Sequence, residues 1–357
     1  MNSFDDQHSH IRALLHALDG MAAGPARTMV LEQFLHEICV SNPFASTLIA
    51  SVLKAIYPND VTLIAEALAT RVPQQGSHAT IMTEKQVDVD ILLLTVKENE
   101  FLACLSAFGV AVGVPSVTLA HDCEVWRAEH SGVSYAIAII GDDGNVESAI
   151  AMGKLWSFVQ FKAAIMVGMA AGVRGKTKLG DVVFGSTILA YEFQRMTETG
   201  PKYQPKVYSP AGRLLQRLPT LTQVSPDWSK NTTYDLLEAV GFEGIADSEE
   251  EQLDPEWRTK IHTGAILAGG KLIEDGSLPQ MRDDLHARVL AAEMEGAGFA
   301  AVCDNERVPW VVVRGVADYG EPQRRKSWQF PATFIACRLV RDAIPLGRLP
   351  VIDTSHL

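Results

Sequence analysis

The sequence predicts an α/β protein, a three-layer sandwich around a mixed, mostly parallel β-sheet, preceded by a small all-helical N-terminal domain. From Val87 onward, short apolar runs rich in β-branched residues alternate with longer stretches of helical spacing. This alternation is typical of strands and helices packed in layers. Before Val72, apolar residues recur only at helical spacing. The change of periodicity therefore predicts two unlike domains.

Residues 1–72 are predicted to form the helical domain, a bundle of about four helices, because their apolar residues repeat every three or four positions. Two turn-forming segments, Gly20–Pro25 and Pro58–Asp60, interrupt this repeat. The polar residues 73–86 are expected to be a linker, and residues 347–357 a tail. The bundle carries no cluster of catalytic residue types, so recruitment or oligomerisation is its expected role.

Residues 87–346 are predicted to form the α/β domain. Six strands are expected, at Val87–Val96, Val133–Ile140, Ala163–Val167, Asp181–Leu189, Gly264–Ala268 and Trp310–Val316. Four helices are expected, at Glu98–Phe108, Val146–Phe158, Ala291–Asn305 and Phe330–Ala343. Residues Glu192–Ile261 have weak periodicity and many Pro, Thr and Ser residues. They are expected to form a long excursion near the active site with one or two short helices.

The composition excludes several classes of protein. The 357 residues are 47% hydrophobic, with 31 Lys and Arg against 43 Asp and Glu, a net charge of −12. This hydrophobic share excludes a mainly disordered chain, and the acidic balance gives no support for binding nucleic acid or an anionic membrane. The five cysteines, none in C-x-x-C spacing, predict neither a disulfide framework nor a zinc site.

The N-terminus MNSFDDQHSHIRALL lacks the pattern of a secretory signal. The most apolar stretch, Ala163–Val173, is shorter than the ~18 residues that span a membrane. A cytoplasmic protein is therefore expected.

Carboxylates and glycine-rich segments follow the predicted strands. In an open α/β sheet, ligands bind beyond the carboxyl ends of the strands. The candidate segments are Glu98–Glu100, Gly168–Gly172, Gly269–Lys271, Glu293–Glu295 and Asp318–Tyr319. Since these segments are expected at one edge of the sheet, they predict a site rich in carboxylates.

Each candidate also has a structural interpretation. Glu98 and Glu100 would favour the dipole of a helix that begins there. Gly168 and Gly172 would allow close packing, and Arg314, inside a buried strand, is expected to pair with one of the carboxylates. Glu293 and Glu295 interrupt an apolar run, where an unpaired carboxylate is costly, and this favours a functional role.

Four blocks, in order, resemble the nucleoside phosphorylase/nucleosidase superfamily, which includes purine nucleoside phosphorylases, methylthioadenosine/S-adenosylhomocysteine nucleosidases and AMP nucleosidases. The blocks are ILLLTVKENEFLACL, MVGMAAGVRGKTKLGDVVFGS, GAILAGGKLIED and AAEMEGAGFAAVCDNERVPWVVVRGVADYG. The last block is the most specific. The resemblance covers Val87 to Leu346 and leaves out the helical domain.

The resemblance implies roles for individual residues. Asp318 would be the acid that protonates N7 of a leaving purine, and Glu100 would orient or deprotonate the attacking water. Glu295 would hold the ribose 2′- and 3′-hydroxyls while Met294 lies against the sugar. The base and sugar pockets would be lined by Gly168, Met169, Ala170, Leu272 and Ile273. Glu293 is either a binding residue or structural. No metal and no organic cofactor is implied.

The resemblance leaves the reaction open between hydrolysis and phosphorolysis. A phosphorylase holds phosphate, usually with arginine. Hexameric bacterial phosphorylases of this family have an arginine before the glycine-rich loop and another in the first loop. The corresponding places hold Val167 and the arginine-free Thr95–Glu100. Hydrolysis of the ribosyl–adenine bond is therefore favoured, with a phosphate-dependent phosphorylase, a methylthioadenosine/S-adenosylhomocysteine-type nucleosidase and a non-cleaving nucleotide-binding module as alternatives.

Two departures from the family point to a 5′-phosphorylated substrate such as AMP or ATP. The base-binding loop reads Ala268–Leu272 where methylthioadenosine nucleosidases usually have S-G-D-x-F, and it introduces Lys271. Further basic residues are candidate phosphate contacts, although a solvated loop explains most of them equally well: Arg174, Arg324, Arg325 and Lys326.

The extra N-terminal bundle loosely resembles death-fold-like adaptor domains. This implies an antiviral defence effector that depletes nucleotides, with a sensor or adaptor protein as the partner of the bundle. The resemblance to the superfamily, whose members assemble as dimers, trimers or hexamers, implies a homo-oligomer.

Overall fold

The computed structural model describes residues 87–111, 114–119, 123–198, 200–210, 227–228, 230–232, 235–236, 258–322 and 327–344. The chain divides into two units, Met1–Thr83 and Glu84–Leu357. The predicted helical bundle, linker and C-terminal tail lie outside the described residues. The description below therefore concerns the second unit.

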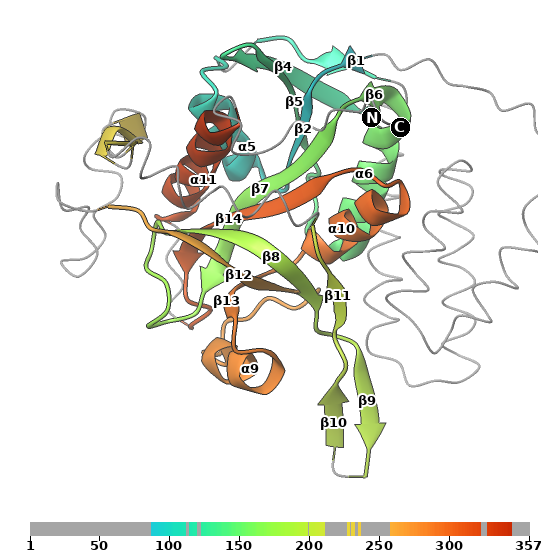
Figure 1. Ribbon diagram of the computed structural model, residues 1–357, viewed down its shortest axis with the longest axis vertical. Helices are drawn as coiled ribbons and strands as arrows, with labels where there is room; N and C mark the ends of the chain where they lie inside the picture. The colour runs from blue at the N-terminus through green and yellow to red at the C-terminus, as the bar shows by residue number, and fades with distance from the viewer. Residues whose placement is uncertain are drawn as a thin grey trace, which may run out of the picture. The chain divides into compact units, whose positions relative to one another are not determined.

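A mixed sheet of ten strands forms the centre of this unit (Figure 1). Nine strands follow one another in the order β11 (Lys206–Tyr208), β8 (Val182–Ala190), β12 (Ile261–Ala268), β13 (Val289–Glu293), β7 (Ala163–Gly172), β2 (Ile91–Thr95), β5 (Val133–Ile139), β4 (Glu124–His130) and β3 (Val117–Thr118). The tenth strand, β14 (Trp310–Asp318), pairs with both β7 and β8. These pairings close five strands, β8, β12, β13, β7 and β14, into a ring.

The direction of the strands is more mixed than predicted. Strand β2 runs parallel to β5 and β7, β14 runs parallel to β7, and β12 runs parallel to β8 and β13. The ring closes through antiparallel contacts of β13 with β7 and of β14 with β8. Antiparallel strands β4, β3 and β11 extend the two edges. The apolar run that predicted the first strand is fully buried in β2, as expected for a strand covered on both faces.

Helices cover the sheet in two pairs (Figure 1). Helix α5 (Glu98–Ala107) packs against α11 (Gln329–Ala343), and α6 (Asn145–Phe158) packs against α10 (Gly296–Asn305). The two pairs lie on either side of β7 and β14 in Figure 1, so the predicted α/β sandwich is present. A further helix, α9 (Leu278–Leu285), packs through Leu278 and Met281 on a small apolar cluster beside β12 and β13.

The prediction of one helix over Ala291–Asn305 is wrong. Residues up to Glu293 form the end of strand β13, and the helix begins only at Gly296. The Ala-rich run carries no pattern that separates strand from helix, so the sequence alone did not show the break. The break has a physical cause, because the Glu293 carboxylate accepts hydrogen bonds from the N–H groups of Glu295 and Gly296. The turn Met294–Glu295 therefore separates the two elements.

The glycine-rich segment is also not a loop, because strand β7 continues through Gly172. A side chain at Gly172 would collide with Thr177 and Val316, so close packing requires glycine here.

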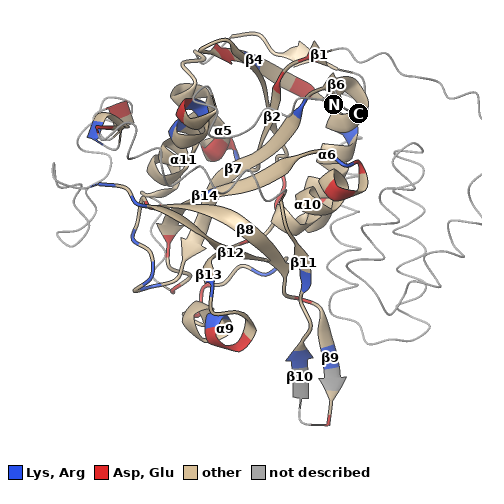
Figure 2. Ribbon diagram, in the orientation of Figure 1, with Lys and Arg blue, Asp and Glu red and all other residues tan. Residues whose placement is uncertain are grey.

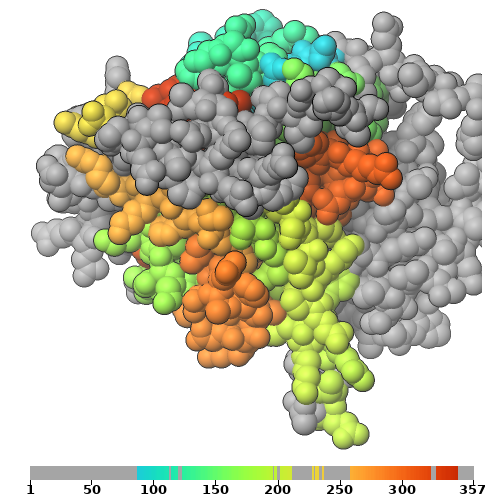
Figure 3. All heavy atoms as spheres, in the orientation of Figure 1, coloured from blue at the N-terminus to red at the C-terminus, as the bar shows by residue number. Residues whose placement is uncertain are grey.

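The excursion Glu192–Ile261 contains strands that the sequence did not predict. A hairpin of β9 (Gln194–Thr197) and β10 (Gly200–Tyr203) projects from the body of the unit, as Figure 3 shows, and β11 joins the sheet. Short strands β1 (Val87–Asp88) and β6 (Val159–Gln160) pair at the start of the domain. No helix among the described residues is long and apolar enough to cross a membrane.

Candidate active site

One cleft, of about 580 Å³, opens where the carboxyl ends of β2, β5, β12, β13 and β14 meet. Ten of the predicted site residues line it: Glu100, Met169, Ala170, Lys271, Leu272, Ile273, Glu293, Met294, Glu295 and Asp318. Five further residues line it that the sequence analysis did not single out: Val96, Lys97, Asp143, Ala171 and Ala292. Segments from both halves of the domain therefore build a single site.

Glu100 lies in the first turn of α5, where its carboxylate is held by backbone donors. The N–H groups of Val96 and Lys97 donate to Oε2, each at 3.0 Å, and the N–H of Met169 donates to Oε1 at 2.7 Å. Only 2% of Glu100 is exposed. This carboxylate ties the end of β2 to β7, so it is fixed in position before any ligand binds.

Arg314, the predicted partner of the carboxylates, is fully buried in β14 beneath the cleft. Its Nη2 donates to the Glu293 carboxylate, and lies 3.4 Å from Glu295 Oε2. Its Nη1 lies 3.9 Å from Glu100 Oε1, beyond hydrogen-bond distance, and neither Nη1 nor Nε has a hydrogen-bond partner among the described residues. A buried donor without a partner is costly, so Nη1 is an open position for a polar ligand atom or water.

Gly168, predicted as a lining residue, is not among the residues that line the cleft, but it borders this open position. A Cβ at residue 168 would collide with both Glu100 Oε1 and Arg314 Nη1. The absence of a side chain therefore keeps the space between the carboxylate and the guanidinium empty of protein.

Glu295 lies in the turn between β13 and α10, where its carboxylate accepts hydrogen bonds from the Gly144 N–H at 3.2 Å and from Arg314 Nη2 at 3.4 Å. Burial raises the pKa of Glu295 to about 8, and the neighbouring Glu293 carboxylate adds to this rise. One guanidinium faces three carboxylates, those of Glu293, Glu295 and Glu100, and cannot neutralise all of them. With its pKa raised to about 8, Glu295 keeps a proton through most of the neutral range.

Asp318 ends strand β14 and lines the cleft together with Glu100. The pairing of β14 with β7 shifts register between Val316 and Asp318, so the ladder is irregular directly before Asp318. Its Oδ1 accepts the N–H of Gly320 at 2.9 Å. Asp318 is 8% exposed, so the carboxyl lies in a largely water-excluded position.

Lys97 and Asp143 form an ion pair at the rim of the cleft, with Nζ and Oδ2 3.1 Å apart. Their side chains are 39% and 40% exposed. The sequence analysis missed both, because charged residues at a helix start and in a turn are usually solvated. The signal that could have found them is position, since each follows the carboxyl end of a central strand, β2 or β5.

Of the five predicted basic residues, the structure describes two, Lys271 and Arg174. Lys271 lines the cleft, but Arg174 does not, because its guanidinium binds the Glu321 carboxylate at 2.5 and 2.6 Å and lies over the Tyr319 ring. Arg324, Arg325 and Lys326 lie outside the described residues. Lys and Arg are spread over α9, α11, β9 and β10 rather than concentrated in one segment (Figure 2).

No group of three or more His, Cys, Asp or Glu side chains suited to a metal ion occurs in the part of the chain that the structure describes.

Comparison with known proteins places this arrangement in a family. Residues 92–338 match the model of the phosphorylase superfamily. The chain is 25% identical over 266 residues to ATP nucleosidase Cap17 from Escherichia coli strain KTE188, covering 72% of this chain and 51% of that protein. It is 28% identical over 197 residues to a 5′-methylthioadenosine/S-adenosylhomocysteine nucleosidase from Tolumonas auensis, covering 55% of this chain and 73% of that protein. This chain thus spans about half of the length of the ATP nucleosidase.

Solved structures share the fold at lower sequence identity. The 5′-methylthioadenosine/S-adenosylhomocysteine nucleosidase from Helicobacter pylori, with butyl-thio-DADMe-Immucillin-A, superposes with a TM-score of 0.54 at 14% identity. The superposition covers 73% of this chain and 99% of that one. The match of the family model over most of the sheet and both helix pairs shows that the chain belongs to the phosphorylase superfamily.

Proposed function

We propose that this chain is an N-glycosidase that hydrolyses the bond between ribose and adenine in adenosine nucleotides carrying 5′-phosphate, such as AMP or ATP. The observation that carries the proposal is the convergence of Glu100, Glu295 and Asp318 on one cleft of about 580 Å³. The names of two relatives, an ATP nucleosidase and a methylthioadenosine nucleosidase, support an adenine nucleoside or nucleotide as substrate.

The base end of the cleft is formed by Asp318 with Ile273 and Ala171. In this proposal Asp318 carries a proton to N7 of the purine, so that the base leaves as a neutral molecule. The Gly320 N–H holds the Asp318 carboxyl in place, and burial keeps competing water away from it. The purine then departs as the bond to C1′ lengthens and positive charge develops on the sugar.

The sugar lies against Met294 in this proposal, with its 2′- and 3′-hydroxyls donating to Glu295. An ionised carboxylate accepts both hydrogen bonds and stabilises the cationic transition state. The raised pKa of Glu295 favours its protonated form, whereas hydrogen bonds donated by the ribose diol favour the ionised form, so binding of the diol is expected to displace the proton. Gly144 N–H and Arg314 Nη2 remain as its fixed donors.

The attacking water is assigned to the space between Glu100 and Arg314. Nη1 of Arg314 is a buried donor without a partner, and Glu100 Oε1 is an acceptor 3.9 Å from it. One water molecule there would donate to Glu100 and accept from Arg314, with a lone pair left for C1′. Glu100 then takes a proton from this water as the new C–O bond forms.

Hydrolysis is favoured over phosphorolysis by the charges around this water position. Three carboxylates face Arg314, and they would repel a phosphate dianion. Val167, which stands where some relatives carry arginine, is fully buried in β7 and cannot contact a ligand.

The proposed biological role is an antiviral defence effector that depletes nucleotides. It is supported by the relative named as an ATP nucleosidase and by a second one, a death domain-containing ATP nucleosidase from Amphimedon queenslandica, 23% identical over 194 residues. That match covers 53% of this chain and 34% of the Amphimedon protein. The proposal includes a homo-oligomer and a sensor or adaptor protein that binds residues 1–72.

Chromatography of released adenine tests the proposal. The protein is incubated with ATP, AMP, adenosine and methylthioadenosine, with and without phosphate. Adenine release without phosphate is expected, with AMP or ATP as a better substrate than methylthioadenosine. Release that requires phosphate would contradict hydrolysis, and preference for methylthioadenosine would contradict the nucleotide substrate. Binding without cleavage over hours would instead support a nucleotide-binding module.

A further inference from the structure

The cleft has two distinct ends. At the base end, the segment of Ile273 is joined to that of Asp318 by the hydrogen bond from Gly276 N–H to Gly320 O, 2.8 Å. At the other end, Lys97 N–H binds Glu100, and Gly144, which follows Asp143, binds Glu295 through its N–H. The Lys97–Asp143 ion pair is therefore joined through its own segments to the two carboxylates assigned to water and ribose.

This placement matters because a nucleoside also has two different ends, the base and the 5′-substituent. The base leaves from C1′, and the 5′-substituent is attached through C4′ on the other side of the ring oxygen. When the base lies against Asp318 and the diol against Glu295, the 5′-substituent extends toward the remaining end of the cleft. The charged lining residues beside Glu100 and Glu295, outside the segments of Ile273 and Asp318, are Lys97 and Asp143.

From this we infer that Lys97 determines specificity at the 5′ end of the substrate, by exchanging Asp143 for the oxygens of a 5′-phosphate. This inference rests on the proposed function. Lys97 and Lys271 are the cationic side chains among the described residues that line the cleft, and Lys271 belongs to the segment at the base end. Lys97 is therefore the cation available to an anion at the other end.

The exchange is physically reasonable because of the surroundings of the pair. With 39% and 40% exposure, this pair is solvated on both sides, and such pairs contribute little stability. A phosphate dianion offers Lys97 twice the charge of Asp143 and several acceptor oxygens. Asp143 binds the Lys97 ammonium at the rim of the cleft, and a neutral 5′-group offers Lys97 no stronger partner.

The test compares kcat/KM for AMP with kcat/KM for adenosine, which differ only in the phosphate. Lys97→Met is expected to lower this ratio about 10- to 100-fold, the loss expected for one charge-assisted hydrogen bond. Asp143→Asn, which removes the competing carboxylate, is expected to raise the ratio several-fold. Lys97→Arg is expected to restore most of the ratio, and added salt to lower it in the unsubstituted protein more than in Lys97→Met.

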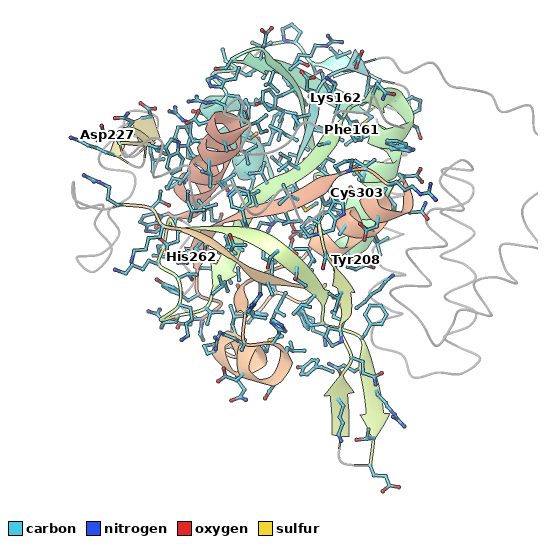
Figure 4. All side chains as sticks on the ribbon, in the orientation of Figure 1. Phe161, Lys162, Tyr208, Asp227, His262 and Cys303 are labelled. Atoms are coloured by element: carbon cyan, nitrogen blue, oxygen red, sulfur yellow. The ribbon has the colours of Figure 1, made fainter. Side chains whose placement is uncertain are left out.

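A matched control is Lys162→Met. Lys162 forms a similar ion pair with Asp90, 2.8 Å long and partly exposed, just before β7 begins, where Figure 4 shows it beside Phe161. This variant is expected to leave the ratio unchanged. A ratio that changes less than threefold in Lys97→Met, or that falls in Asp143→Asn, overturns the inference. The proposed function fails separately, when the unsubstituted protein releases no adenine from AMP or adenosine.

Discussion

Arg314 with its carboxylates and Lys97 with Asp143 are both ion pairs of the cleft, but the first group is buried and the second is exposed at the rim. Arg314 is fully buried and contacts Glu293 and Glu295, whereas Lys97 and Asp143 are both partly exposed. A buried charge must keep its partners, because unpaired it is costly, while an exposed charge can change partners freely. Arg314 and its carboxylates therefore form a fixed group, whereas Lys97 and Asp143 can change partners when a substrate binds.

The largest expected effect on activity comes from Asp318, the buried residue assigned as the acid. Asp318→Asn removes the transferable proton and keeps the shape, so kcat for adenine release should fall by about 1000-fold or more, in the upper range for general acid catalysis. Far-ultraviolet circular dichroism should remain unchanged. Asp304→Asn is the control, since Asp304 accepts a hydrogen bond from Trp310 away from the cleft. Retained activity in Asp318→Asn would remove this residue from the role of acid.

Second is the loss of Arg314 itself. Arg314→Met leaves buried carboxylates without their cation, and we expect the free energy of unfolding to fall by about 3–5 kcal/mol. Urea titration followed by tryptophan fluorescence measures this change. The control is Arg174→Met, whose exposed pair with Glu321 should contribute no more than about 1 kcal/mol. Equal losses in the two variants would show that burial does not distinguish these pairs.

The protonation of Glu295 predicts a pH dependence of stability. Its pKa in the folded protein is raised to about 8 from an ordinary value of 4.5. Between these values the folded state keeps a proton that the unfolded state has lost. Stability should therefore fall as pH rises from 4.5 to 8, by up to about 1.4 kcal/mol per pH unit.

Melting temperatures between pH 5 and pH 8 check this sign. Glu295→Gln should flatten the profile, while Glu98→Gln, an exposed carboxylate in the first turn of α5, should retain it. A profile that stays equally steep in Glu295→Gln would show that another group holds the proton.

The smallest expected effect belongs to the rim. Lys97→Met should change the free energy of unfolding by less than about 0.5 kcal/mol, because exposed pairs contribute little. Urea titration of this variant beside Arg314→Met makes the comparison direct. A loss near that of Arg314→Met would mean that the rim pair is part of the fold.

The sequence predicted the three central carboxylates because each follows a strand or interrupts an apolar run. Glu100, Glu295 and Asp318 could be found in this way, and so could the ion pair of Arg314, since a buried guanidinium needs a partner. The roles assigned to these residues stay predictions until the variants are measured. The α/β architecture also followed from the alternation of apolar runs and helical spacing.

Other features could not be read from local sequence. Strand β13 has the composition of a helix, and its pairing with β12 and β7 makes it a strand. The ring of strands depends on β14 pairing with both β7 and β8, a long-range contact that periodicity does not encode. Lys97 and Asp143 lie 46 positions apart in the sequence and meet only because β2 and β5 are neighbours in the sheet.

The proposed mechanism requires that residue 168 carry a hydrogen atom, as glycine does, where every other residue carries a Cβ. The Cα of Gly168 faces the gap between Glu100 Oε1 and Arg314 Nη1, and a methyl group would occupy that gap. If the attacking water lies in this gap, then Gly168→Ala would displace it while leaving every acid and base of the site in the sequence. Catalysis would then depend on the missing side chain at residue 168 as much as on the ionisable groups around it.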